Sequence, residues 1–94
     1  MSDITATTVS ADGVAVSGPA RVKSIYYIRG SSAGSIVLKD GGSSGTTLLT
    51  LTTPGAGSGV DAANTMSIPA DGIRFSTNVH VDVTNVTSVT LFHA

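Results

Sequence analysis

Short β-branched runs, broken by Gly, Pro, Asp and Ser about every eight to twelve residues, limit the fold of this chain more than any other feature. No apolar stripe with helical spacing persists for three turns. The length of 94 residues allows one domain at most, because independent domains cluster at roughly 100–150 residues. We therefore expect a single all-β domain.

The runs predict eight or nine strands, and the turn signals between them suggest how they connect. The expected strands are 3–9, 14–16, 21–29, 35–39, 46–53, 66–68, 73–75, 79–83 and 87–93. We expect the first two strands to form a hairpin, the third to fifth a meander, and the last two another hairpin. Because every short strand needs its inward face covered, two packed sheets fit better than an open sheet or a small closed barrel.

The predicted fold class is therefore all-β: a small two-sheet β-sandwich, jelly-roll-like or Greek-key, with short strands and Gly-rich loops. Residues 1–18 are expected to form an N-terminal arm or first hairpin, and residues 19–94 the body of the sandwich. In the longest strand, strict alternation places Val22 and Tyr26 on one face and Ile25 and Tyr27 on the other. One tyrosine ring should then lie in the core. The other should either meet a neighbouring subunit or pack under a loop of its own chain.

Charge and cysteine content exclude several classes of function. Charged residues make up 12% of the chain, against about 25% in a typical soluble domain, and the net charge is −1. Such a balance gives no long-range attraction for phosphate backbones or anionic lipids, so neither nucleic acid nor a membrane is an expected partner. The lack of cysteine removes disulfides, thiol catalysis and thiolate metal sites. The N-terminal residues lack the basic and apolar regions of a signal peptide, which predicts synthesis in the cytoplasm.

Residues that could carry chemistry are few. A metal site would need His80 and His93 with a carboxylate such as Asp82, but a solvated face opposite the valines of 79–83 explains His80 and Asp82 better. A hydrolytic triad can be written only because serines and aspartates abound. The glycine loops lack the strand, helix and lysine of a phosphate cradle. We predict no enzyme, and no catalytic, cofactor or metal-binding residues.

The surface composition points to assembly instead. A domain of this size without disulfides or metal depends on a small core, so additional burial would stabilise it. Its surface is rich in hydroxyl groups and glycine, and these lose little side-chain freedom on contact. The small net charge removes the self-repulsion that keeps proteins apart. Such a surface favours packing against copies of itself or against a larger lattice.

Five strand and turn phrases carry a resemblance to a known class of proteins. They are 21–30, 34–42, 46–51, 68–75 and 85–92. In these phrases the chain resembles small virion proteins of tailed bacteriophages, especially those of aquatic bacteria. The likeness spans about residues 20–94 and includes no catalytic signature. It implies a β-sandwich subunit bound in many copies to the outside of a capsid, or to the tail or neck.

The leading hypothesis is a capsid decoration, or cement, protein on the outer capsid surface. Its expected partners are the major capsid protein and further copies of itself, as a trimer. A strand-like N-terminal arm, residues 2–9, would add to the sheet edge of a neighbour, because main-chain pairing needs no special side chains. The alternatives are a tail, neck or fibre-associated subunit, and a host-surface or glycan-binding module. The expected contacts are Ile4 and Val9 as arm anchors, Ile25 and Tyr27 as subunit contacts, and loops 41–45 and 55–63 as exposed tips.

Overall fold

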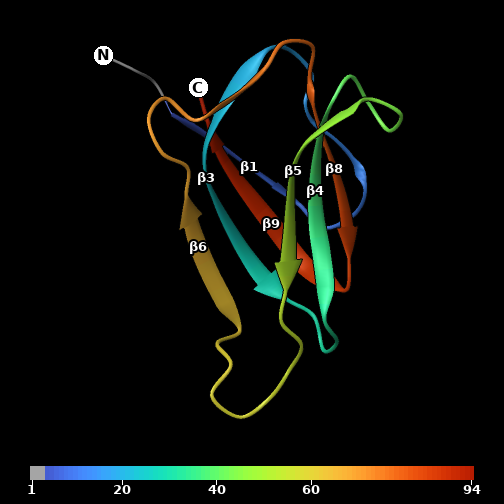
Figure 1. The fold of residues 1–94 in the computed structure, drawn as a ribbon, viewed down its shortest axis with the longest axis vertical. Helices are drawn as coiled ribbons and strands as arrows, with labels where there is room; N and C mark the ends of the chain where they lie inside the picture. The colour runs from blue at the N-terminus through green and yellow to red at the C-terminus, as the bar shows by residue number, and fades with distance from the viewer. Residues whose placement is uncertain (1–3) are drawn as a thin grey trace.

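The computed structural model describes residues 4–94, which form nine strands and no helix (Figure 1). The strands are β1 (Thr5–Val9), β2 (Gly13–Val16), β3 (Ala20–Arg29), β4 (Gly34–Asp40), β5 (Thr46–Thr53), β6 (Ala63–Ser67), β7 (Ile73–Phe75), β8 (Val79–Thr84) and β9 (Val86–His93). One antiparallel sheet has the order β1-β9-β3-β6, with β7 also pairing with β3, and the other has the order β2-β8-β4-β5. The predicted two-sheet β-sandwich is confirmed.

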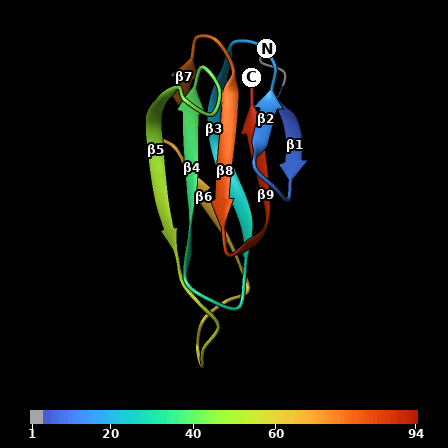
Figure 2. The ribbon, with the colours of Figure 1, turned by 90° about the vertical axis from the view of Figure 1, so that its right-hand side faces the viewer.

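The connectivity is that of a jelly roll. The strands β6 and β7 follow one another along the same edge of β3, so together they act as one interrupted strand. Each sheet then has four positions, and β1, β9, β3 and β6 lie over β2, β8, β4 and β5 respectively (Figure 2). Most connections cross from one sheet to the other. Four of them, β1–β2, β3–β4, β5–β6 and β8–β9, join strands that lie opposite each other across the core.

Three of the predicted strand pairings are wrong for this reason. The strands β1 and β2 form no hairpin, because β1 pairs with β9 and β2 pairs with β8. The expected meander is only a β4–β5 hairpin, since β3 belongs to the other sheet. The last two strands, β8 and β9, likewise lie in different sheets. The alternation of side chains predicts strands, but a reversal of the chain can lead either to a neighbour in the same sheet or across the core.

The core fills the space between the sheets with aliphatic side chains and one aromatic ring. Its buried hydrophobic members are Ala20, Val22, Ile25, Ile36, Leu38, Phe75, Val79, Val81, Val89 and Leu91. Val22 and Ile25 both face inward although they are three residues apart. A register shift between Val22 and Ser24, opposite β9, leaves Lys23 as the extra residue of a β-bulge, which changes the side-chain alternation along β3. The predicted assignment of these two residues to opposite faces is therefore wrong.

The N-terminal segment is part of the sandwich as far as the structure describes it. Residues 5–9 form β1 and pair along their whole length with β9, from Thr5 opposite His93 to Val9 opposite Val89. A hydrogen bond between Thr8 Oγ1 and Thr90 Oγ1 (2.8 Å) and one between Thr7 Oγ1 and His93 Nε2 (2.9 Å) join the same strands. Residues 2 and 3 of the expected arm lie outside the described residues. The described part of that arm is thus an outer strand, with one edge unpaired within residues 4–94.

Candidate interaction surface

The four residues expected to contact neighbours lie in different environments. Ile4 precedes β1 and is 49% exposed, so its side chain is available to a partner. Val9, at the end of β1, is partly buried against the core. Ile25 is 0% exposed within the single chain, so the expectation that it contacts another subunit is wrong. The bulge at Lys23 is the cause, because it turns Ile25 toward the interior.

Tyr27 lies on the inner face of β3. It is partly buried and packs against the hydrophobic core of its own chain. Its partner across the sheet is Asn64 of β6, an exposed residue near the open side of the sandwich. Two environments were expected for this ring, a contact with a neighbouring subunit or packing within its own chain. The contacts within residues 4–94 fit the second.

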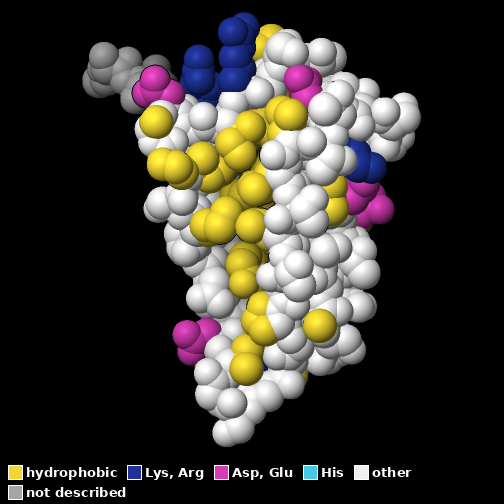
Figure 3. Space-filling view, in the orientation of Figure 1, with side chains coloured by type: hydrophobic (Ala, Val, Ile, Leu, Met, Phe, Trp, Pro, Cys, Tyr) yellow, Lys and Arg dark blue, Asp and Glu magenta, His cyan; other side chains and the backbone are white. Residues whose placement is uncertain are grey.

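The sandwich is closed on one side and open on the other. At the closed side β1 and β2 lie against each other, whereas β5 and β6 make almost no contact across the opposite side. Hydrophobic side chains show at the surface there as a band along the long axis, between the positions of β6 and β5 (Figure 3). Leu49 and Leu51 of β5 are partly buried and pack against the core from this side. The open side therefore exposes part of the apolar interior.

The strand β5 borders this band and is the longest outer strand. Its eight residues include no charge and no proline, and within residues 4–94 it pairs only with β4. Soluble proteins usually protect an outer strand with charges, proline, a bulge or short length, because its unpaired N–H and C=O groups can pair with another chain. One bulge is present, where Leu48 is the extra residue opposite Leu38 and Lys39. The part from Leu49 to Thr53 is left regular and unprotected.

A polar cluster occupies the outer face of the β2-β8-β4-β5 sheet. The Oδ2 atom of Asp82 lies 2.8 Å from Lys39 Nζ, and its Oδ1 atom lies 2.8 Å from His80 Nε2. His80 is only 6% exposed, which corrects the expectation of a solvated side chain. An ionised carboxylate accepts hydrogen bonds, so Nε2–H donates to Asp82, and Nδ1 has no hydrogen-bond partner within residues 4–94. The pKa of Asp82 is lowered most by its hydrogen bond with Lys39 and second by its hydrogen bond with His80.

This cluster does not make a metal or hydrolytic site. His80 and His93 lie in different sheets, and His93 bonds to Thr7 instead. Within residues 4–94 no group of three or more His, Asp, Glu or Cys side chains lies close enough to hold a metal ion. No serine hydroxyl among the described hydrogen bonds contacts either histidine ring. The cluster is best described as a structural ion pair with a buried imidazole beside it.

Replacement of Lys39 by methionine is expected to raise the pKa of Asp82 toward that of an ordinary aspartate. The variant keeps the aliphatic length of the side chain but removes the ammonium group that contributes most to the lowered pKa. A carboxyl-detected NMR titration measures this directly. Asp40 is an internal control, because Lys39 does not contribute to its lowered pKa. An unchanged Asp82 titration would contradict the assignment.

Asp40 ties the β4–β5 loop to the segment between β7 and β8. Its carboxylate accepts hydrogen bonds from Ser76 N (3.0 Å), Ser76 Oγ (2.9 Å), Thr77 N (2.9 Å) and Asn78 N (3.4 Å). Asn78 Oδ1 returns the contact by accepting from the backbone N–H groups of Gly41 and Gly42. The backbone donor of Thr77, followed by that of Ser76, lowers the pKa of Asp40. The loop at 41–45, expected as an exposed tip, is therefore fixed at its base.

The lowered pKa of Asp40 predicts a loss of stability in acid. A carboxyl group whose pKa is lower in the folded state stabilises the fold fully above its unfolded pKa of about 4, and loses that contribution as the pH falls through the folded pKa. The melting temperature of the wild type should therefore fall more steeply below about pH 4 than that of Asp40→Asn. Thermal melts monitored by circular dichroism across this range test the difference. If the melting temperatures of the two proteins fall equally with pH, Asp40 does not contribute to the loss of stability in acid.

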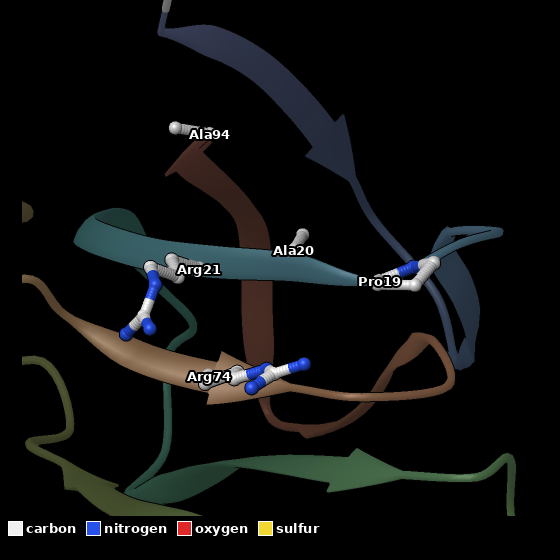
Figure 4. Close-up of a pocket in the computed structure, with 5 residues that line it drawn as sticks. All are labelled: Pro19, Ala20, Arg21, Arg74 and Ala94. Carbon is white, nitrogen blue, oxygen red and sulfur yellow. The ribbon is translucent and has the colours of Figure 1, made fainter. Parts of the chain in front are cut away.

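A shallow hollow at the start of β3 is the other surface feature with charged residues. It is lined by Pro19, Ala20, Arg21, Arg74 and Ala94 (Figure 4). Arg21 and Arg74 lie directly opposite each other on β3 and β7, and neither forms an ion pair within residues 4–94. None of the lining side chains can act as a nucleophile or general base near neutral pH. The hollow thus lacks the groups that a catalytic site needs.

Comparison of the chain with protein-family models, with curated proteins and with solved structures found no match. Within residues 4–94 there is also no helix of the length and apolar character needed to cross a membrane. The surface features that remain as candidates are the unpaired outer strands, with Ile4 beside β1 and the apolar band beside β5. The edge of β5 was not predicted from the sequence, because an uncharged strand without proline fits the middle of a sheet equally well.

Proposed function

We propose that this chain is a bacteriophage virion structural protein, a capsid decoration or cement protein that binds the outer capsid surface and stabilises the head. The observation that carries the proposal is a jelly roll with unpaired, uncharged outer strands on a surface of low charge. Jelly rolls are an architecture of viral capsid proteins. The resemblance of residues 20–94 to small virion proteins supports the same class. The protein would be made in the host cytoplasm and act in the virion.

The edge of β1 is the proposed contact with the major capsid protein. Its outer side is unpaired within residues 4–94, and its sequence from Thr5 to Val9 carries no charge. A strand of the capsid protein could add there, because main-chain hydrogen bonds supply affinity without special side chains. Ile4, half exposed at the start of this edge, would add an apolar anchor. Binding of this kind is stoichiometric and needs no catalytic group.

Ile4→Asp is expected to weaken binding to capsid shells tenfold or more. The substitution places a charge at the anchor, where burial against the capsid would remove it from water. Val14→Asp is a matched control, because Val14 is 50% exposed and Ile4 49%, but Val14 lies on β2. Co-sedimentation with expanded shells of the candidate major capsid protein measures both affinities. Equal losses in the two variants would remove Ile4 from the interface.

The same experiment separates the proposal from its alternatives. Saturable binding to expanded shells supports decoration, whereas saturable binding only to assembled tails or necks would move the protein to that part of the virion. Lectins also use jelly rolls, so a glycan array tests a host-surface function. The chain has no Trp and only 4% aromatic residues, which disfavours the stacking platform that sugars need. Binding to glycans without binding to virion parts would overturn the proposal.

A further inference from the structure

The outer strands of the sandwich differ in how much unpaired edge they offer. The strands β1 and β6 have five residues each, β2 has four and β7 has three, whereas β5 has eight. Within residues 4–94 no backbone group outside β4 pairs with β5. An unprotected edge of this length is a template for a further strand.

The side chains on the two faces of β5 determine which sequence could add to its edge. Leu49 and Leu51 face the interior, opposite Leu38 and Ile36 of β4, at the open side of the sandwich. Thr50 and Thr52 face outward and are exposed. A strand added here would therefore need apolar side chains on its inner face and small polar side chains on its outer face. It would also need no charge that the apolar band would strip of water.

The sequence of β5 itself meets this requirement. The segment Leu49-Thr50-Leu51 reads the same in both directions, and it is followed by Thr52 and Thr53. In an antiparallel pair centred on Thr50, Leu49 of one copy lies opposite Leu51 of the other, and Thr50 lies opposite Thr50. Leucine then faces leucine on the inner side, and Thr50 faces Thr50 on the outer side. Thr52 of each copy lies opposite Leu48 of the other, where the bulge of β5 ends the regular part of the edge. No charged residue of β5 enters the contact, so like-charge repulsion does not oppose it.

We propose that β5 pairs antiparallel with β5 of a second copy of this chain, about a two-fold axis that passes beside Thr50. The β2-β8-β4-β5 sheets of the two subunits would then form one continuous sheet. The apolar bands at the two open sides would face each other (Figure 3). Such an interface is isologous and closes with two copies. It replaces the trimer expected from the sequence with a dimer. It does not involve β1 or Ile4, so the capsid contact remains available.

Disulfide trapping tests the register of this pair. The chain contains no cysteine, so a single substitution gives an unambiguous readout. Residues directly opposite in an antiparallel pair have Cβ atoms about 4.5–5.5 Å apart, near the span of a disulfide. Thr50→Cys is therefore expected to form a covalent dimer under mild oxidation, seen on a non-reducing gel. Thr52→Cys is the matched control on the same exposed face, because four residues of offset place its sulfur atoms about 13 Å apart.

A charge at the axis supplies a second, independent test. Thr50→Lys would place two ammonium groups opposite each other and should weaken the dimer tenfold or more, while circular dichroism shows an unchanged fold. Sedimentation velocity across the micromolar range measures the association of the wild type and the variant. A wild type that stays monomeric or forms a trimer would overturn the proposal, as would equal cross-linking of Thr50→Cys and Thr52→Cys. These measurements use the isolated chain, so they do not depend on capsid binding.

Discussion

Replacing Phe75 with alanine is expected to lower the free energy of unfolding by about 3–5 kcal/mol. Within residues 4–94, Phe75 is the largest fully buried side chain and the only aromatic ring in the buried core. It ends the three-residue strand β7, which is too short to be held by its pairing with β3 alone. Domains of this kind have total stabilities of about 5–15 kcal/mol, so the variant should lose about a fifth or more of the free energy of unfolding. Urea denaturation followed by circular dichroism measures the loss.

Leu48→Ala is the matched control for Phe75→Ala. Leu48 is 38% exposed at the bulge of β5, so truncation removes little buried surface and leaves no internal cavity. Its expected cost is below about 1 kcal/mol. Similar losses in the two variants would mean that the core does not lie where the burial pattern places it.

Gly72→Ala is expected to destabilise the fold by about 3 kcal/mol, through two effects that can be separated. Gly72 has a φ of 82°, a conformation that costs an L-residue about 1–2 kcal/mol. A Cβ atom at this position would also meet the backbone carbonyl of Val22, so β3 or the turn before β7 would have to move. Such backbone shifts cost about 1–3 kcal/mol more.

Gly59→Ala isolates the first effect. Gly59 has nearly the same φ, 79°, but nothing lies within 4 Å of a Cβ atom built there. This variant should lose only the conformational part, about 1–2 kcal/mol. Chemical denaturation of both variants gives the difference. If Gly59→Ala costs as much as Gly72→Ala, the close approach of the turn to β3 contributes nothing to stability.

Strands whose alternation is unbroken could be predicted from the sequence. The valines of residues 79–83 alternate with polar residues, and in the structure Val79 and Val81 of β8 are fully buried. The strand at residues 73–75 was predicted with the bounds that β7 has. In both places a turn signal precedes the strand and no bulge interrupts it. Under those conditions a period of two is enough to identify the element and its inward face.

The face of Ile25 could not be predicted, because one extra residue reverses the alternation. Nothing in the sequence around Lys23 marks the bulge, which exists only relative to the pairing with β9. The partner of each strand was equally inaccessible, since the same turn residues serve a hairpin and a crossing between sheets. The expected subunit contact at Ile25 depended on strict alternation, so it was wrong as well.

The candidate surface was predicted in part. The sequence indicated a weakly charged exterior. Ile4 is exposed at the start of β1, and its contact with a partner stays a prediction. The burial of His80 was missed, because alternation places it on the outer face without showing that Lys39 and Asp82 flank it there. Which strands form the edges of a sheet depends on topology. The exposed edge of β5 therefore became visible only in the fold.

The thermal stability of capsid shells tests the central proposal most directly. Expanded shells of the major capsid protein are titrated with the purified chain, and their disruption temperature is followed by light scattering. The proposal predicts a rise that saturates at a fixed ratio of chain to capsid protein and is lost with Ile4→Asp but retained with Val14→Asp. A disruption temperature that stays constant while the added chain remains folded would contradict a role in strengthening the capsid.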